Sequence, residues 1–331
     1  MKKLLVMILA LTFVLSMSFG NFAQATEPAD MTSINIPKFF KLTNDDTISP
    51  VETFNFNIEK FDVTDSQYTF ANMPMFSQTT FSIPFIEHEA DFDGDTNNFT
   101  LNLPTYEHVG IFTYKITETA GTTAGVTYDG NPLYLTVTVI NGSNGLIRQV
   151  TSLYYLDNNI KLKAQNFKNT FSARELAITK EVTGNLGQKD RAFEVTITLT
   201  APTGKDISKV PVTYSGGEYT TPQTVTFTNG EAVVKFNIKH GDTITFNNLP
   251  YGVKYDVVET APGDGYDPAG YAFSDNLNKI DSVQDTVKIT NNKTKQVETG
   301  INLDSLPYII ILVAAGGGLV LFMRRRISDR H

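Results

Sequence analysis

Two sets of one lysine, one glutamate and one asparagine recur in the same order in the two halves of this 331-residue chain. A neutral lysine amine beside an asparagine carboxamide is a nucleophile facing an electrophile. A protonated glutamate can hydrogen-bond the carboxamide oxygen, polarise its carbon and move protons while ammonia leaves. The product is an amide bond between two side chains, and packing supplies the proximity. The first triad is Lys38, Glu118 and Asn169, and the second triad is Lys180, Glu259 and Asn291.

The strand pattern around the triads directs their side chains into a core. Successive side chains of a β-strand alternate between its faces, so residues two apart share a face. Each lysine and each glutamate therefore shares a face with apolar residues. The four pairs are Ile36 with Lys38, Ile116 with Glu118, Ile178 with Lys180, and Val257 with Glu259.

Lysine and glutamate are almost never fully buried unless they are paired. Two plainer interpretations are open: a lysine at a strand end whose amine reaches water, and an ordinary buried ion pair. Amide formation is the interpretation that also accounts for the asparagine. Burial lowers the pKa of a lysine and raises the pKa of a glutamate, which favours the neutral amine and the protonated acid.

The chain between its terminal segments repeats once and consists of short strand-like runs. Residues rich in Val, Ile, Thr, Phe and Tyr alternate with polar residues, and Asp-Gly or Asn-Gly turns separate them. This pattern predicts an all-β chain with two tandem β-sandwich domains, at residues 26–172 and 173–295. The matching segments are 34–38 with 176–180, 102–104 with 248–250, and 114–120 with 255–261. Sandwich core is the simplest interpretation of the Phe-rich first half: Phe39, Phe40, Phe54, Phe56, Phe61 and Phe70.

The composition excludes several classes of protein. The chain has no cysteine, so it has no disulfide framework, thiol nucleophile or Cys-ligated zinc. The formal net charge of −8 argues against a nucleic-acid partner. The acidic run 91–97 resembles a calcium loop, but its glycine is at the fourth position and no glutamate follows at the twelfth. We expect a solvated turn there, and neither a metal nor a cofactor.

The two ends of the chain carry features of export and anchoring. Residues 1–25 combine Lys2 and Lys3, an apolar run and an Ala-Gln-Ala site, which predicts a cleaved signal peptide; an uncleaved membrane helix is the alternative. Residues 306–323 are apolar and just long enough to span a bilayer. The arginines at 324–326 favour a cytoplasmic C-terminus.

A polar pentapeptide stands just before the apolar span: Gln296, Val297, Glu298, Thr299 and Gly300. The pentapeptide, span and arginines at residues 296–331 together resemble the sorting signal of Gram-positive surface proteins. The resemblance implies that a sortase cleaves between Thr299 and Gly300 and transfers the threonyl group to an amine. Glu298 stands where the family has proline, which favours a dedicated pilin sortase over a general one. A plain membrane anchor is the alternative.

The triads and the sorting signal closely resemble the two-domain major pilins of Gram-positive bacteria, of the streptococcal T-antigen type. The resemblance covers nearly all of the mature chain. It implies two CnaB-like, immunoglobulin-type sandwiches, each with a self-generated Lys–Asn isopeptide bond and a glutamate catalyst. The implied bonds join the lysine and the asparagine of each triad. Asn292 is a possible competitor of Asn291, but parity with Ile289 favours Asn291.

The same resemblance implies that a shaft subunit offers a lysine to Thr299 of its neighbour. The family's linking lysine lies shortly before the asparagine of the first domain, where this chain has Lys161 and Lys163. Neither aligns without a one-residue shift, and we expect Lys161 first and Lys163 second; two solvated strand residues are the alternative. The implied partners are a pilin-class sortase, neighbouring copies, minor pilins and peptidoglycan.

These features predict an exported structural subunit of a covalent pilus on a Gram-positive cell surface, which turns over no substrate. A wall-anchored adhesin or ligand-binding protein that never polymerises is the first alternative. An extracellular hydrolase is the second, and it would need a clustered carboxylate pair that the sequence does not show outside the two triad glutamates. The size of the mature chain favours the repeating subunit.

Overall fold

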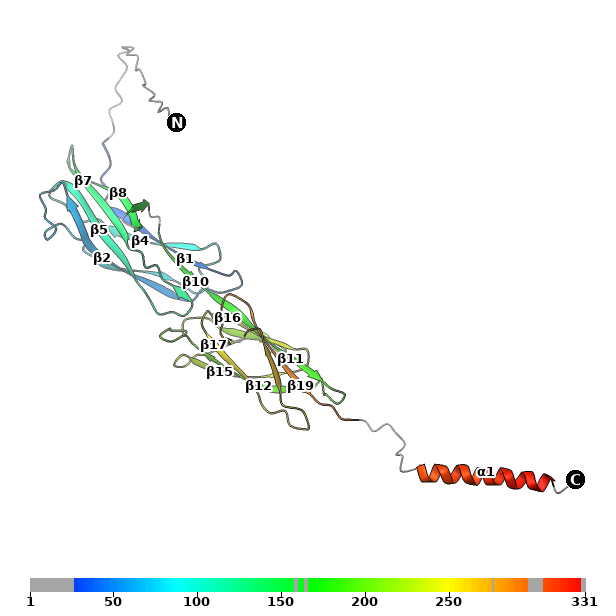
Figure 1. The fold of residues 1–331 in the computed structure, drawn as a ribbon. Helices are drawn as coiled ribbons and strands as arrows, with labels where there is room; N and C mark the ends of the chain where they lie inside the picture. Colours follow the sequence, from blue (N-terminus) through cyan, green and yellow to red (C-terminus); the bar gives the residue numbers. More distant parts are fainter. Residues whose placement is uncertain (1–26, 158–159, 164–165, 276, 297–305, 329–331) are drawn as a thin grey trace, which may run out of the picture. The chain divides into compact units, whose positions relative to one another are not determined.

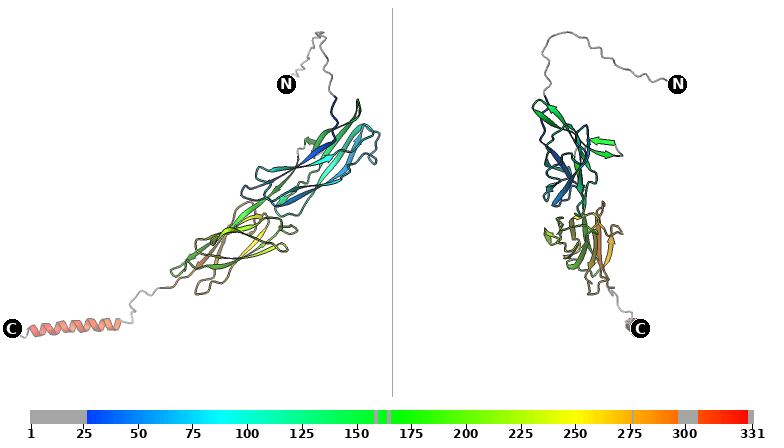
Figure 2. Two further views of the ribbon diagram at one scale, coloured as in Figure 1. Left: turned by 180° about the vertical axis from the view of Figure 1, so that it is seen from behind. Right: turned by 90° about the vertical axis from the view of Figure 1, so that its left-hand side faces the viewer.

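The computed structural model describes residues 27–157, 160–163, 166–275, 277–296 and 306–328. The chain divides into two compact units between Ser172 and Ala173. The strands of each unit form two layers (Figure 1 and Figure 2). The chain is mostly β, as predicted. The predicted signal peptide, residues 1–25, lies outside the described residues.

The first unit is a sandwich of a four-stranded and a six-stranded sheet. The smaller sheet has the order β4-β1-β10-β6, in which β1 and β10 run parallel and the other pairs are antiparallel. The larger sheet is antiparallel, with the order β3-β2-β5-β7-β8-β9. The strands are β1 (Ser33–Leu42), β2 (Glu52–Thr64), β3 (Thr80–Phe85), β4 (Asp95–Asn102), β5 (Gly110–Thr119), β6 (Val126–Thr127), β7 (Leu133–Gly142), β8 (Gly145–Asp157), β9 (Ile160–Lys163) and β10 (Phe167–Phe171).

Alternating side chains place one face of each central strand in the core of the first unit. In β1, Ile36 and Phe40 are buried, and Lys38 lies between them on the same face. Phe40, Phe54 and Phe85 contact one another edge to face, with ring centroids 5.1 to 5.6 Å apart. Because Phe40 comes from the smaller sheet and the other two from the larger, these rings join the two layers.

Two of the phenylalanines that the sequence assigned to the core lie outside it. Phe61 is 43% exposed and Phe70 is 54% exposed, and Phe39 is half-buried. Phe61 lies on the same face of β2 as the exposed Asn57, and packs edge-on against Tyr134 with ring centroids 4.6 Å apart. The expectation was wrong for Phe61 because it used composition without the alternation of β2.

The second unit also has two sheets. The six-stranded sheet has the order β14-β13-β16-β11-β19-β18, with β11 and β19 parallel, and the three-stranded sheet has the order β15-β12-β17. Ile178, Val195 and Phe246 are fully buried in the core of this unit. The strands are β11 (Ala173–Thr183), β12 (Phe193–Thr200), β13 (Thr213–Gly216), β14 (Tyr219–Thr224), β15 (Glu231–Ile238), β16 (Thr243–Pro250), β17 (Lys254–Glu259), β18 (Gly270–Phe273) and β19 (Asp285–Asn292).

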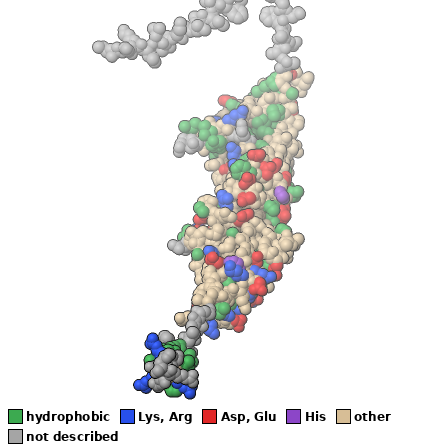
Figure 3. Space-filling model, turned by 90° about the vertical axis from the view of Figure 1, so that its right-hand side faces the viewer, with side chains coloured by type: hydrophobic (Ala, Val, Ile, Leu, Met, Phe, Trp, Pro, Cys, Tyr) green, Lys and Arg blue, Asp and Glu red, His purple; other side chains and the backbone are tan. Residues whose placement is uncertain are grey.

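The only helix among the described residues is α1 (Leu306–Ser328). Its segment Tyr308–Arg326 has a mean hydropathy of 1.7 and none of its side chains is buried, so it is long and apolar enough to cross a membrane. Arg325 and Arg326 lie in its last turn. On the face of the two units drawn in Figure 3, acidic and basic side chains are interspersed.

Candidate functional site

Three strands hold the first triad. Lys38 lies on β1, Asn169 on β10 and Glu118 on β5. β1 and β10 are parallel neighbours, and their register sets Phe40, two residues beyond Lys38, opposite Asn169. β5 belongs to the facing sheet, so Glu118 reaches the other two side chains across the core of the sandwich.

Glu118 uses its two carboxylate oxygens for two partners. Lys38 Nζ donates to Oε2 at 2.8 Å, and Asn169 Nδ2 donates to Oε1 at 2.5 Å. Lys38 is 0% exposed and Asn169 is 1% exposed, and the side chain of Glu118 is wholly buried. The structure therefore excludes a lysine that reaches water at this position. The amine and the carboxamide lie against one carboxylate.

The surroundings of Lys38 are apolar. Its Nζ lies 4.4 Å from the ring centroid of Phe54 and 5.9 Å from that of Phe167. Burial lowers the pKa of Lys38 to about 8, although the charge of Glu118 acts in the opposite direction. Burial also raises the pKa of Glu118, against the effect of Lys38. Both shifts favour the neutral amine and the protonated acid that amide formation requires.

The carboxamide oxygen of Asn169 has a different partner from the expected one. The backbone N–H of Asp129 donates to Oδ1 at 2.8 Å, so the amide nitrogen is the atom that faces Glu118. The expected hydrogen bond from Glu118 to this oxygen is absent from the first triad. The reason is that a backbone donor already orients the carboxamide, and a donor requires the oxygen on its side.

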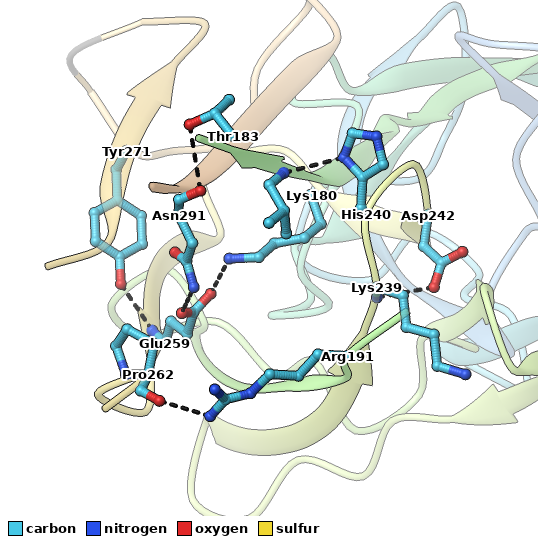
Figure 4. A network of polar contacts seen from close by, with 11 residues as sticks. Lys180, Thr183, Arg191, Lys239, His240, Asp242, Glu259, Pro262, Tyr271 and Asn291 are labelled. Atoms are coloured by element: carbon cyan, nitrogen blue, oxygen red, sulfur yellow. Dashed lines mark hydrogen bonds and ion pairs between the residues drawn. The ribbon is translucent and has the colours of Figure 1, made fainter. Parts of the chain in front are cut away.

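The second triad has the same arrangement on β11, β17 and β19 (Figure 4). Lys180 Nζ donates to Oε2 of Glu259, and Asn291 Nδ2 donates to Oε1 at 2.5 Å. Glu259 comes from the facing three-stranded sheet, and all three side chains are buried. Lys180 Nζ lies 4.4 Å from the ring centroid of Phe193, and burial lowers the pKa of Lys180.

Asn291 and the neighbouring Asn292 have different partners. The structure places Asn291 at Glu259, while Asn292 Nδ2 donates to Asp267 at 2.7 Å. The backbone N–H of Glu259 donates to the hydroxyl of Tyr271 at 2.8 Å (Figure 4). Neither this tyrosine nor Asp129 of the first unit belongs to a repeated segment, so the sequence offered no signal for either contact.

The carboxamide oxygens distinguish the two triads. Asn169 Oδ1 accepts a backbone hydrogen bond, whereas Asn291 Oδ1 is buried without a hydrogen-bond partner in the described part of the chain. A buried carbonyl oxygen without a donor is rare in folded proteins. The two sites therefore share their lysine and glutamate contacts but differ at the atom that would receive negative charge during attack.

The two lysines that could receive a neighbour's threonine lie on β9, at the edge of the six-stranded sheet. Lys161 and Lys163 are both exposed. Lys161 Nζ lies 4.6 Å from the ring centroid of Tyr154. Both lysines line a groove of about 490 Å³ together with residues 150–154 of β8.

The sequence also singled out the acidic run 91–97 and the sorting motif at residues 296–300. Among the described residues, no group of three or more His, Cys, Asp or Glu could hold a metal ion. In the acidic run, Asp91 accepts a hydrogen bond from the Gly94 N–H at 2.7 Å, and Asn97 donates to the Pro84 carbonyl at 2.8 Å. Gln296 is exposed, and residues 297–300 of the sorting motif lie outside the described residues.

Two family models match the chain. Residues 35–172 match the Spy0128-like isopeptide containing domain. Residues 174–300 match a domain of unknown function, DUF7601. The first description names an isopeptide for the unit that contains Lys38, Glu118 and Asn169. The second description assigns no chemistry to the unit that contains the second triad.

The similar proteins belong to streptococcal pili. The chain is 25% identical to a pilin of Streptococcus pyogenes serotype M1 over 314 residues, which is 88% of this chain and 90% of the pilin. It is 30% identical to the pilus tip adhesin Cpa of Streptococcus pyogenes over 138 residues, 39% of this chain and 18% of the adhesin. The crystal structure of the major pilin from Streptococcus pyogenes shares the fold, with a TM-score of 0.51, 21% identity, and coverage of 80% of this chain and 99% of that chain.

Proposed function

We propose that this chain, a homologue of a streptococcal pilin, is a structural subunit of a covalent pilus on a Gram-positive cell surface. The similarity to the pilin extends over 90% of that protein, and the similarity to the tip adhesin over only 18%. These shares favour a pilin over a tip adhesin. The proposed subunit turns over no substrate. Its chemistry is a single reaction with itself in each unit, without a cofactor.

The observation that carries the proposal is a buried carboxylate shared by a lysine and an asparagine, present once in each unit. An ordinary ion pair is complete with lysine and glutamate, and gives no reason for an asparagine at the same carboxylate. Buried ion pairs are weak contributors to stability, because removing two charges from water offsets their attraction. We infer that both triads form Lys–Asn amide bonds, including the triad in the unit of unassigned function.

The contacts of the first triad suggest how the bond forms. Lys38 passes one proton to Glu118 Oε2 and becomes a neutral amine. Its Nζ attacks Asn169 Cγ, and the carbonyl electron pair moves onto Oδ1. Glu118 then gives one proton to Nδ2 from Oε1 and takes the second proton of Nζ at Oε2, and the electron pair returns to the carbonyl as ammonia leaves. One proton remains on Glu118, so atoms and charges balance without an oxidant or a metal.

The intact mass of residues 26–299 tests this chemistry. Each amide bond expels one ammonia of about 17 Da, so the chain should weigh about 34 Da less than its sequence. Glu118→Ala and Glu259→Ala should each retain a loss of about 17 Da. Glu59→Ala is the matched control, because it breaks an exposed 2.8 Å pair with Lys115 and should keep both losses. A wild-type mass equal to the sequence would refute amide formation at both sites.

For assembly, we infer that a pilin-class sortase joins Thr299 of one copy to Lys161 or Lys163 of the next. The groove beside β8 supports this acceptor site, because both lysines line it. Minor pilins and peptidoglycan would be joined by the same transfer of a threonyl group to an amine. Lys161→Arg, Lys163→Arg and the double variant, expressed in the bacterium, test the acceptor by polymer ladders on boiled gels. Ladders that persist in the double variant would refute this acceptor site, and their absence from the unmodified protein would favour a non-polymerising wall protein.

A further inference from the structure

Asp129 contacts the carboxamide oxygen of the first triad through its backbone. Its N–H donates to Asn169 Oδ1 at 2.8 Å. Its own carboxylate accepts at both oxygens: Oδ2 from the N–H of Lys168, and Oδ1 from the N–H of Asn131, each at 3.0 Å. Asp129 is thereby attached to β10 directly before Asn169, and to its own loop on the other side.

This arrangement replaces one step of the sheet ladder between β6 and β10. The ladder ends with the pair Thr127 and Thr170, so the register sets Asp129 opposite Lys168. An antiparallel ladder would place its next backbone pair there. Instead the Lys168 N–H binds the Asp129 carboxylate, and the Asp129 N–H is left for the side chain of Asn169. The carboxylate therefore frees a backbone donor and aims it at the carboxamide.

The preceding residue holds the same loop from another direction. The hydroxyl of Tyr128 donates to Glu52 Oε2 at 3.1 Å and accepts from the N–H of Thr123 at 3.3 Å. The ring of Tyr128 packs edge-on against Phe54, the ring that lies below Lys38 Nζ. Two consecutive residues are thus fixed, and the donor at Asp129 has little freedom to move away from the site.

The second unit lacks this donor. Its strand β18 takes the place of β6 beside the last strand, and pairs Gly270 with Thr290, the residue before Asn291. Gly270 therefore stands where Asp129 stands in the first unit, but it has no carboxylate and belongs to the regular ladder. Asn291 Oδ1 is correspondingly without a partner among the described residues.

We propose that Asp129 is a positioning residue for the first amide bond: its carboxylate holds its own N–H where negative charge develops on Asn169 Oδ1. This inference rests on the proposed amide chemistry. When Lys38 Nζ attacks Cγ, the electron pair moves onto Oδ1, and the hydrogen bond from the N–H strengthens. When ammonia leaves, the pair returns to the carbonyl. Glu118 still moves every proton, so the two residues act on different atoms.

The rate of bond formation in freshly made chains tests this proposal. Residues 26–299 are synthesised in a cell-free system, quenched in denaturant at successive times, digested, and assayed for the Lys38–Asn169 and Lys180–Asn291 linked peptides by mass spectrometry. The second bond is an internal clock in every molecule. Losing one fixed oxyanion donor costs roughly 100- to 1,000-fold in rate. Asp129→Ala keeps the N–H of residue 129 but removes the carboxylate contacts that fix its position. We therefore expect the first bond to form at least ~10-fold more slowly relative to the second.

Three controls separate positioning from stability. Asp91→Ala removes another carboxylate that accepts a loop N–H in the same unit, and should leave the ratio unchanged. Asp129→Asn keeps one acceptor oxygen and should slow the first bond less than Asp129→Ala. In the unlinked Glu118→Ala background, Asp129→Ala should speed amide hydrogen exchange at residue 129 and at Lys168, whose N–H loses its acceptor, without changing it along β1, β5 and the rest of β10.

The outcomes distinguish the inference from the function on which it rests. An unchanged ratio in Asp129→Ala overturns the role of Asp129 while both amide bonds stand. A slower first bond accompanied by faster exchange throughout β1, β5 and β10 also overturns it, because loss of stability would then explain the rate. Absence of both linked peptides from the wild-type chain refutes the amide chemistry itself.

Discussion

Lys38 can titrate only while the amide bond is missing, and this gives the bond a signature in the pH dependence of stability. Asn169→Ala prevents the bond but retains the 2.8 Å contact between Lys38 and Glu118, which does not pass through Asn169. In the linked chain the former amine is a neutral amide with no proton to exchange in the range considered. The two chains should therefore respond differently to alkaline pH.

The direction of the change in stability follows from the pH at which Lys38 loses its proton in the folded and in the unfolded state. The pKa of Lys38 is about 8 in the folded chain and 10.5 when unperturbed. Below pH 8 the lysine is protonated in both the folded and the unfolded state, so the folded state bears the full free-energy penalty of burying the charge. Between pH 8 and 10.5 the unfolded state binds more protons than the folded state, so the free energy of unfolding rises with pH. At about 1.4 kcal/mol per pKa unit, we expect a rise of roughly 2 kcal/mol between pH 8 and pH 10.

Guanidinium unfolding followed by far-UV circular dichroism measures this change, because the chain has no tryptophan to report by fluorescence. Burial raises the pKa of Tyr106 and Tyr128 to about 12. Their contribution to the free energy of unfolding is therefore lost only above pH 10, the ordinary pKa of tyrosine. For this reason pH 10 is the upper limit of the experiment. Lys38→Met added to Asn169→Ala is the control, and should not show the rise. A flat profile in Asn169→Ala, or an equal rise in the linked wild type, would refute the assignment.

Three further changes have expected outcomes. Glu118→Ala prevents a bond that closes residues 38 to 169, a loop worth about 5 kcal/mol in the chain-entropy model, so calorimetry should show the first unit melting roughly 10–20 °C lower while the second is unchanged. Phe54→Ala lets water approach the amine, so the Lys38 pKa should move toward its ordinary value and the linked peptide should accumulate more slowly in the time course. Tyr271→Phe removes the acceptor of the Glu259 N–H and should reduce the free energy of unfolding of the second unit by about 1 kcal/mol in chemical denaturation.

The alternation of side chains along single strands explains which buried positions could be predicted from the sequence. The position of Lys38 two residues beyond Ile36 was enough to predict burial, and the structure places both in the core. The same rule, applied to β2, would have placed Phe61 with Asn57 on the outer face. Alternation is a local property, so it is readable wherever the strand is correctly located.

Contacts between segments far apart in the chain could not be derived in the same way. Asp129 reaches Asn169 only because the ladder of β6 ends after two residues, and Tyr271 on β18 reaches the backbone of Glu259 from the other sheet of the second unit. The orientation of the Asn169 carboxamide depends on that backbone donor, so the sequence predicted the wrong partner for its oxygen. The point where each strand ladder ends, together with the side chain that stands there, decides these contacts.

The acceptor lysine decides which residues carry tension in a polymer of this subunit. Force arriving from a neighbour's Thr299 would enter at Lys161 or Lys163, only a few residues before β10. It would pass along β10 and Ser172 into β11, and cross at Lys180 to Asn291. The second bond is therefore on the path of the force, and residues 181–290 are bypassed. The first bond is beside the path, where it ties the loaded strand β10 to β1.

Pulling polymers of variant subunits separates these two roles. Without the second bond, in Asn291→Ala, the 110 residues from 181 to 290 join the path, and at about 3.5 Å per residue each subunit should lengthen by on the order of 400 Å. Asn169→Ala should give no step of that kind from the first unit, because residues 27–160 precede the point where force enters. Force spectroscopy on sheared pili measures both. Long steps from Asn169→Ala would show that tension enters nearer the N-terminus than Lys161, and would remove both lysines as acceptors.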